Sequence, residues 1–137
     1  TTSTGKKRDK PPRARAAFCG GIGVRNMSFF LTPQQVIAGT KTVTRRFGWG
    51  FLKPGDMVRP VLKGMGLKRG EKIKPLRGPL RIVSLRWEPL NAIDQSDCER
   101  EGFPGMEPGE FVGMLVRHYG IKDPGVPVCR IEFSYTD

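Results

Sequence analysis

Alternating apolar and polar residues give the clearest prediction of strands in this chain. Over residues 128–135 the odd-numbered positions are Cys, Ile, Phe and Tyr, and their neighbours are mostly polar. A period of two predicts a half-buried strand. Residues 80–87 form the longest strand candidate, and shorter β-branched or apolar segments predict strands at 27–30, 41–46 and 57–62.

The segment 32–39 carries residues that begin and end a short helix. Thr32 suits the N-cap, Pro33 suits the first helical position, and Gln35 closes a capping box. Gly39 is a natural C-cap because glycine adopts a left-handed conformation without steric cost. A helix of about two turns is therefore predicted between these caps.

Two more helices are expected in the second half of the chain. Asp94 can cap a helix that runs toward Glu101, and Phe111 and Met114 have the spacing of an amphipathic helix over 110–118. Strands and helices do not alternate as they do in βαβ units. The expected fold class is therefore α+β, with a small mixed or closed sheet of about five or six strands flanked by short helices.

The first 26 residues differ from the rest in charge and hydrophobicity. They hold seven lysines and arginines against one aspartate, and the first 17 contain no aromatic and no β-branched aliphatic residue. Such a segment cannot bury enough surface to offset its ordering entropy. We predict a basic, mostly disordered arm at 1–26 and one domain at 27–137. The arm can tether nucleic acid, increase solubility or be the remnant of an upstream segment.

The overall composition narrows the class of protein. The 137 residues carry 24 lysines and arginines against 13 aspartates and glutamates, a net charge of +11, which favours a polyanionic partner. No apolar run approaches the roughly 18 residues of a membrane span, so no membrane association is expected. Three widely spaced cysteines favour a reducing, cytoplasmic location over a disulfide scaffold. One histidine and no CxxC pair argue against a metal site, and no cofactor is expected.

The segment 38–46 concentrates residues that can carry chemistry. Just after the helix end it places a lysine, two hydroxyls and two arginines: Lys41, Thr42, Thr44, Arg45 and Arg46. Hydroxyl and guanidinium groups can bind phosphate or the edges of a base. Taken alone, the segment fits a basic, solvent-exposed edge strand better than a site.

The order of the later segments changes this interpretation. The capped helix leads into Gly-x-Lys-x-x-Thr-x-Arg at 39–46, then a Pro-Gly-Asp turn at 54–56 and a Glu-Gly-Phe segment at 101–103. This order resembles the ASCH domain family, over about residues 27–136. The resemblance implies a β-barrel related to PUA domains, with an RNA-linked cleft beside the motif.

The resemblance also implies a chemistry. Some small ASCH proteins are amidohydrolases that remove the acetyl group from N4-acetylcytidine with the motif's lysine and threonine and a later glutamate. The matching positions are Lys41, Thr44 and Glu101, with Glu99 as an alternative acid. Thr44 would attack or position a water, Lys41 would be the base, and Glu101 would orient the lysine or shuttle a proton. Arg46, the arginine of the motif, would hold a phosphate or stabilise charge.

Strand geometry sets a condition on this site. Residues 41 and 44 of a regular strand point to opposite faces. Lys41 and Thr44 can therefore share a site only if Lys41 precedes the regular strand or a bulge intervenes. Thr42, Thr44 and Arg46 are expected to share a face.

Further residues are candidates for binding RNA or a nucleoside. Thr42, Arg45 and Arg46 adjoin the catalytic candidates. Trp49, in a loop, can stack on a base or pack in the core, whereas Trp87, in a strand, is expected to pack in the core. An exposed basic loop adds three cations, Lys63, Lys68 and Arg69.

The arm and the basic loop distinguish this chain from the compact amidohydrolases and favour a polyanion over a free nucleoside. The sequence therefore favours a module that binds RNA or a modified nucleoside in a basic cleft. The alternative is an amidohydrolase that acts on N4-acetylcytidine or a similar small amide, and a ribonuclease is a weaker one. Binding and hydrolysis are not exclusive, because one cleft can do both.

Overall fold

The computed structural model describes residues 24–64 and 67–137. Most of the expected arm, residues 1–23, lies outside the described residues. The first described strand begins at Arg25, two residues before the strand expected from the sequence, so Arg25 and Asn26 belong to the sheet.

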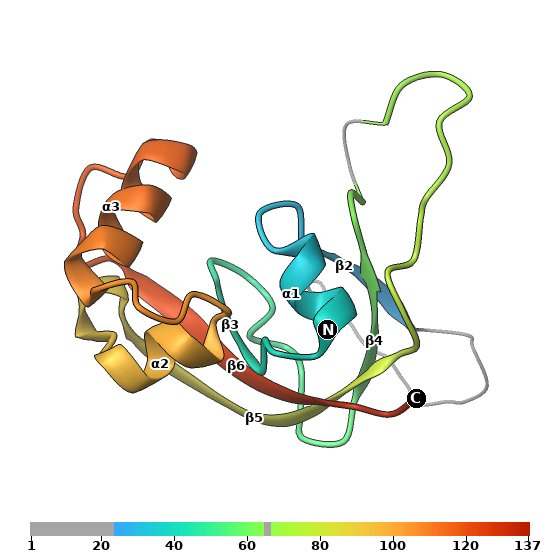
Figure 1. Cartoon of the computed structure of the whole chain (residues 1–137). Helices are drawn as coiled ribbons and strands as arrows, with labels where there is room; N and C mark the ends of the chain where they lie inside the picture. Colours follow the sequence, from blue (N-terminus) through green and yellow to red (C-terminus); the bar gives the residue numbers. More distant parts are fainter. Residues whose placement is uncertain (1–23, 65–66) are drawn as a thin grey trace, which may run out of the picture.

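Five strands form one sheet over the described residues (Figure 1). In spatial order they are β2 (Arg25–Ser28), β4 (Met57–Val61), β5 (Leu80–Pro89), β6 (Pro127–Tyr135) and β3 (Val43–Arg46). β2 pairs in parallel with β4, and the other neighbours are antiparallel. The sheet supports the expected α+β class.

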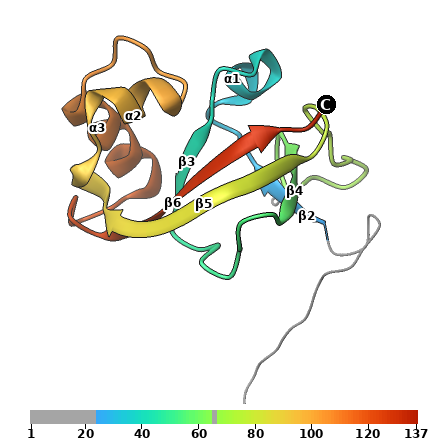
Figure 2. The same ribbon diagram turned by 90° about the horizontal axis from the view of Figure 1, so that it is seen from below.

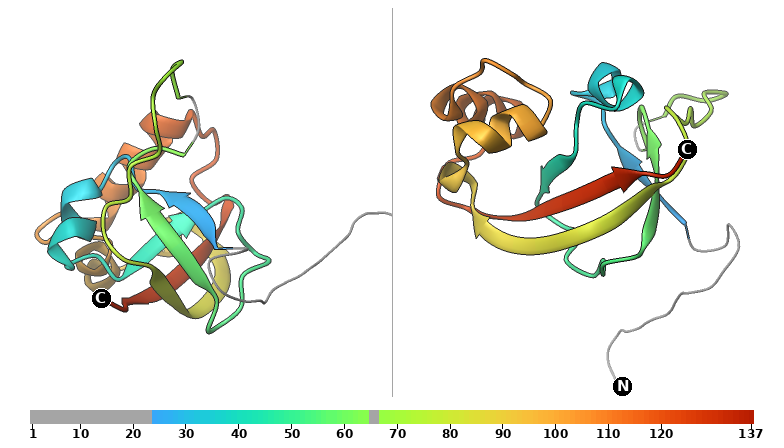
Figure 3. Two further views of the ribbon diagram at one scale, coloured as in Figure 1. Left: turned by 90° about the vertical axis from the view of Figure 1, so that its right-hand side faces the viewer. Right: turned by 60° about the horizontal axis from the view of Figure 1, so that its bottom comes forward.

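Of the two expected forms, a small mixed or a closed sheet, the described sheet is the mixed one, and it is open instead of the barrel that the ASCH resemblance implies. β2 and β3 lie at its two edges and are only four residues long. The chain between them passes through helix α1 (Pro33–Ala38), which lies over the concave side of the sheet (Figure 3).

The longest pair, β5 with β6, gives the sheet its curvature. The register shifts between Ile82 and Ser84, which marks a bulge. Bulges bend a strand and increase its twist. Figure 2 shows β5 and β6 as a long curved ribbon that joins the helices at one end to β4 and β2 at the other.

Helix α1 has most of the features predicted for it. Pro33 lies at its start and Gly39 closes it with a φ of 78°. The expected capping box is not formed, because the Thr32 side chain makes no capping hydrogen bond. Gln35 is used elsewhere: its side-chain amide donates to the carbonyl oxygen of Gly102, at 3.3 Å. The residue expected to close the cap therefore ties α1 to the segment after α2.

The remaining helices pack at one end of the sheet. They are the short 3-10 helix η1 (Leu90–Ala92), α2 (Gln95–Arg100) and α3 (Pro108–Tyr119). Asp94 caps α2 as predicted, with its side chain accepting from the backbone of Asp97. No helix in the described part of the chain is long and apolar enough to cross a membrane.

The described core consists of two clusters. The first, which includes Met27, Phe29, Val36 and Ile131, lies between the sheet and α1. The second, which includes Phe111, lies between α3, η1 and the start of β6. The candidate site lies where the two clusters meet.

Candidate functional site

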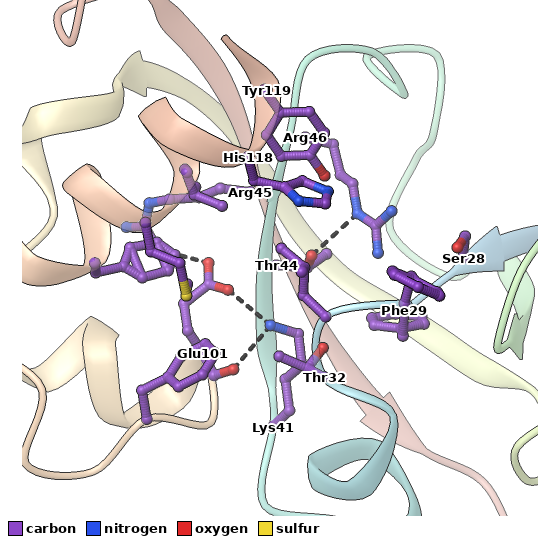
Figure 4. A pocket seen from close by; sticks show the side chains of 16 residues that line it. Ser28, Phe29, Thr32, Lys41, Thr44, Arg45, Arg46, Glu101, His118 and Tyr119 are labelled. Atoms are coloured by element: carbon purple, nitrogen blue, oxygen red, sulfur yellow. Dashed lines mark hydrogen bonds and ion pairs between the residues drawn. The ribbon is translucent and has the colours of Figure 1, made fainter. Parts of the chain in front are cut away.

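A cavity of about 220 Å³ takes its lining from both core clusters. Phe29 of the first cluster and Phe111 of the second contribute to its apolar wall. Five polar or charged residues, from the Gly-x-Lys-x-x-Thr-x-Arg motif and the C-cap of α2, also line it: Lys41, Thr44, Arg45, Arg46 and Glu101. Figure 4 shows Lys41, Thr44, Arg46 and Glu101 converging from two sides of the cavity.

Lys41 lies in the turn between α1 and β3, not in the strand. Its backbone N–H and that of Thr40 donate to the carbonyl oxygen of Gln35 in α1, and regular pairing begins only at Val43. The hydroxyl of Tyr135 donates to the carbonyl oxygen of Lys41. Because Lys41 precedes the strand, its side chain can share the cavity with Thr44, which is the first of the two conditions set by strand geometry.

Lys41 and Glu101 form a buried ion pair. Lys41 Nζ donates to Glu101 Oε1 at 2.7 Å and to the backbone carbonyl oxygen of Glu101 at 2.8 Å. The two side chains are only 3% and 4% exposed. Burial lowers the pKa of Lys41, because a charged amine is costly away from water, and Glu101 offsets part of this effect. Glu99 is exposed, so Glu101 is the carboxylate that faces the lysine.

Thr44 and Arg46 lie side by side on the same edge strand. Arg46 Nε donates to Thr44 Oγ1 at 3.1 Å, and the Arg46 guanidinium lies 4.8 Å from the ring centroid of Phe29. Since the Thr44 oxygen accepts this bond, its own proton is left to donate into the cavity. Thr42 does not line the cavity; its backbone bonds Arg100 and Phe133 instead.

Arg45 connects Glu101 to an ionic cluster behind the cavity. Its guanidinium donates to the carboxylates of Glu101, Glu88 and Asp97, and its side chain is 1% exposed. Asp97 also accepts from Arg130 and Arg100. These bonds, that of Arg130 first, hold the pKa of Asp97 far below its usual range. Arg45 also lines the cavity, and its contact with Glu101 fixes the position of that carboxylate. Binding of substrate or RNA by Arg45 stays a prediction.

Four other predicted binding residues do not line the cavity. The loop that carries Lys63, Lys68 and Arg69 projects from the opposite end of the sheet from α3 (Figure 1). Lys63 lies 3.5 Å from Glu71 within that loop. Trp49 packs partly against the first core cluster. Nucleic-acid binding by these residues stays a prediction.

The expectation that Trp87 packs in the core is wrong. Its partner across β6, Cys129, is fully buried, but Trp87 is 55% exposed. Trp87 lies against Gly50, which has no side chain to cover it. The alternation of apolar and polar residues along β5 does not show where the hydrophobic core ends, and the core ends before Trp87.

Sequence reasoning did not assign the remaining lining residues to the site. They are mostly apolar or aromatic: Ser28, Phe30, Leu31, Thr32, Phe103, Met114, Leu115, His118 and Tyr119. The α3 residues were predicted as an amphipathic face, a pattern that a core and a cavity wall share. Only the Glu-Gly-Phe segment carried a signal, because it places Phe103 two residues after Glu101.

Other chemistries find little support in the described ranges 24–64 and 67–137. No group of three or more His, Cys, Asp or Glu residues there is arranged to hold a metal ion. Cys98 and Cys129 are free and buried, and burial raises the pKa of both thiols. A thiol of raised pKa is a poor nucleophile.

Comparison with solved structures supports the fold. The chain resembles a protein of Enterococcus faecalis V583 described by the family model DUF984, with a TM-score of 0.51 and 17% identity over 77% of this chain and 66% of that one. It also resembles an ASCH domain of Lactobacillus crispatus JV V101, with a TM-score of 0.48 and 15% identity over 76% of this chain and 69% of that one. No family model and no curated protein matches the chain.

These likenesses concern the fold alone. The likeness to the Enterococcus protein supports the α+β architecture, whose sheet is open over the described residues. The chain spans 66% of the length of the Enterococcus protein, just under two thirds.

Proposed function

We propose that the cavity binds a modified nucleoside and hydrolyses an amide on its base, with N4-acylated cytidine as the substrate class. The observation that carries this proposal is the buried pair of Lys41 and Glu101 beside Thr44. A site that only binds a neutral nucleoside does not need a desolvated amine held at its wall. An acyl-transfer site does, because the base must be able to lose its proton near neutral pH.

The residues have complementary roles in such a reaction. In the fraction of molecules in which Lys41 has lost its proton, its amine takes the proton of the Thr44 hydroxyl as Thr44 Oγ1 forms a bond to the acyl carbon. Arg46, which already contacts Thr44, donates to the oxyanion that develops. The C–N bond then breaks, and the leaving amine takes a proton from Lys41. A water, activated by the same amine, hydrolyses the acyl-threonine and restores Thr44.

Glu101 acts through Lys41 in this scheme. Its carboxylate and its backbone carbonyl both accept from Lys41 Nζ, so they fix the direction of the amine. Arg45 holds the other carboxylate oxygen at 3.0 Å. We therefore assign Lys41 and Thr44 as catalytic residues and Glu101 and Arg45 as positioning residues.

The size and lining of the cavity support a nucleoside-sized substrate. Its 220 Å³ lie below the range of about 300–1,000 Å³ typical of drug-sized ligands. Phe29, Phe111 and Tyr119 provide apolar surface for a planar base, and Arg46 and Thr44 provide hydrogen-bonding groups. An RNA helix cannot enter a cavity of this size, although an unpaired nucleotide can.

The test is deacetylation of N4-acetylcytidine, followed by the change in ultraviolet absorbance. We expect Lys41→Ala and Thr44→Ala to reduce turnover by at least about 100-fold, the lower range of a general base. Lys53→Ala is the matched control, because Lys53 is an exposed lysine that does not line the cavity, and it should keep native turnover. Circular dichroism checks that each variant is folded.

Two results would contradict the hydrolase. One is a native protein that binds N4-acetylcytidine without turning it over, which would leave a binding module. The other is turnover that persists in Lys41→Ala, which would move the chemistry to other residues.

A further inference from the structure

Three aromatic side chains form a second surface outside the cavity, on the loop after β3 and the end of β5. We call Trp49, Phe51 and Trp87 the aromatic platform. Phe51 and Trp87 are 56% and 55% exposed. The rings of Trp49 and Phe51 have centroids 5.5 Å apart and planes inclined by 33°. None of the three lines the cavity.

The platform is held in place by its surroundings. Trp49 packs against the first core cluster, which anchors one side of the platform. A Cβ atom on Gly50 would lie 2.8 Å from the Trp87 indole, so only glycine lets the loop approach this ring. Trp49 has a φ of 76°, a conformation that few non-glycine residues adopt, and this turn places Trp49 and Phe51 near each other. The exposed rings are thus preorganised.

Positive charge adjoins the exposed rings. The guanidinium of Arg25 lies 4.6 Å from the centroid of Phe51. The sequence that precedes Arg25 carries six lysines and arginines against one aspartate within residues 1–23.

We propose that the aromatic platform stacks unpaired bases of a single-stranded nucleic acid, with Arg25 beside it contacting the phosphates. Proteins bind single-stranded nucleic acids by combining aromatic rings with basic side chains. The rings stack on the bases, because every base offers a π-face, and the basic side chains contact the phosphates. A duplex keeps these faces stacked inside and offers them poorly. An apolar peptide would not use the cations, and the net charge of +11 favours a polyanion. The inference does not depend on hydrolysis in the cavity.

The experiment uses the full chain and a ten-nucleotide, fluorescein-labelled oligocytidylate RNA, with affinity measured by anisotropy. We expect Trp87→Ala and Phe51→Ala each to weaken binding about 5- to 100-fold, the effect of losing one stacked base. Trp87→Phe should retain most of the affinity. Val83→Ala is the matched control, because Val83 is an exposed apolar residue of the same strand, 45% exposed and outside the platform.

Intrinsic fluorescence gives a second, direct readout. The chain has two tryptophans, Trp49 and Trp87, and both belong to the platform. Unlabelled single strand should therefore quench the tryptophan emission of the native protein, whereas a duplex of equal length should quench it much less.

Native affinity in both Trp87→Ala and Phe51→Ala, or equal quenching by the duplex, would overturn the proposal. Trp87→Ala should keep native deacetylation, because Trp87 does not line the cavity. The two proposals can therefore fail independently: loss of deacetylation would concern the cavity, and loss of RNA binding would concern the aromatic platform.

Discussion

At the scale of single residues, Arg45 links the cavity to a buried ionic cluster. It bonds three carboxylates from two elements, that of Glu88 in β5 and those of Asp97 and Glu101 in α2 and its C-cap. A buried arginine with such partners cannot be removed without leaving several carboxylates short of a partner. Arg45 therefore joins the stability of the fold to the geometry of the cavity.

We expect Arg45→Met to lower the free energy of unfolding by about 3–5 kcal/mol, the cost of removing one member of a buried ionic group. Urea denaturation measures this change. Arg86→Met is the matched control: Arg86 also bonds Glu88, but its side chain is 61% exposed. An exposed pair contributes about 0–1 kcal/mol. Equal, small losses in both variants would show that the buried cluster does not stabilise the protein.

The sequence predicted the residues of the cavity unevenly. Lys41 and Thr44 stand three positions apart in a motif, so local pattern could group them, and the Glu-Gly-Phe segment indicated Glu101. Asp97 was missed because it lies 52 residues from Arg45 and has the ordinary position of an acidic residue in the first turn of a helix. Nothing in a local pattern shows that three arginines reach it.

At the scale of elements, the key side chains stand at junctions. Lys41 lies between α1 and β3, and Glu101 is the C-cap of α2. Element ends such as Pro33, Gly39 and Asp94 follow local steric rules and were predicted correctly. The sequence could not show that Gln35 would bond Gly102 across the fold instead of capping its own helix, because that choice depends on how the helices pack.

The junction at Gly102 gives the prediction at this scale. Gly102 has a φ of 102°, and a Cβ atom there would lie 2.7 Å from Cγ of Gln35. We expect Gly102→Ala to lower the melting temperature and to reduce deacetylation, because α1 must shift relative to Glu101. Thermal unfolding and turnover are measured together.

Gly105→Ala separates packing from backbone strain. Gly105 also has a positive φ, 85°, but a Cβ atom there would meet open space. Its substitution should cost only the backbone strain of about 1–2 kcal/mol and leave turnover intact. If both variants behaved alike, the contact between Gly102 and Gln35 would not position the site.

At the scale of the whole molecule, the basic loop with Lys63, Lys68 and Arg69 lies away from the cavity. The basic loop projects from the end of the sheet that is remote from α3, so its cations cannot hold a small substrate in the cavity. Charge patterning along the chain predicted the loop but not its location. Closure of the sheet was also beyond local patterns, because it depends on whether β2 and β3, at opposite edges of the sheet, meet.

We expect the triple variant K63Q/K68Q/R69Q to bind single-stranded RNA more weakly and with less dependence on salt. If each cation contacts one phosphate, the slope of log affinity against log salt should fall by about 2. Titrations between about 50 and 200 mM salt measure it. Deacetylation should be unaffected.

A triple variant outside the loop, K53Q/R81Q/K122Q, removes the same charge from exposed positions. An equal fall in slope in this control would mean that the net charge of the protein, and not the position of the loop cations, determines the salt dependence of RNA binding. An unchanged slope in the loop variant would exclude the loop from binding.

The bond from Tyr135 to the backbone of Lys41 has a consequence for how the chain folds. It joins residues 94 positions apart, and the Lys41–Glu101 pair joins residues 60 apart. Helices α1 and α2 have six residues each, too few to persist alone. During synthesis, the lysine therefore cannot be buried until the last strand has left the ribosome. Chains that still lack β6 carry an ordinary solvated amine, and the buried Lys41–Glu101 pair forms only once β6 has joined the sheet.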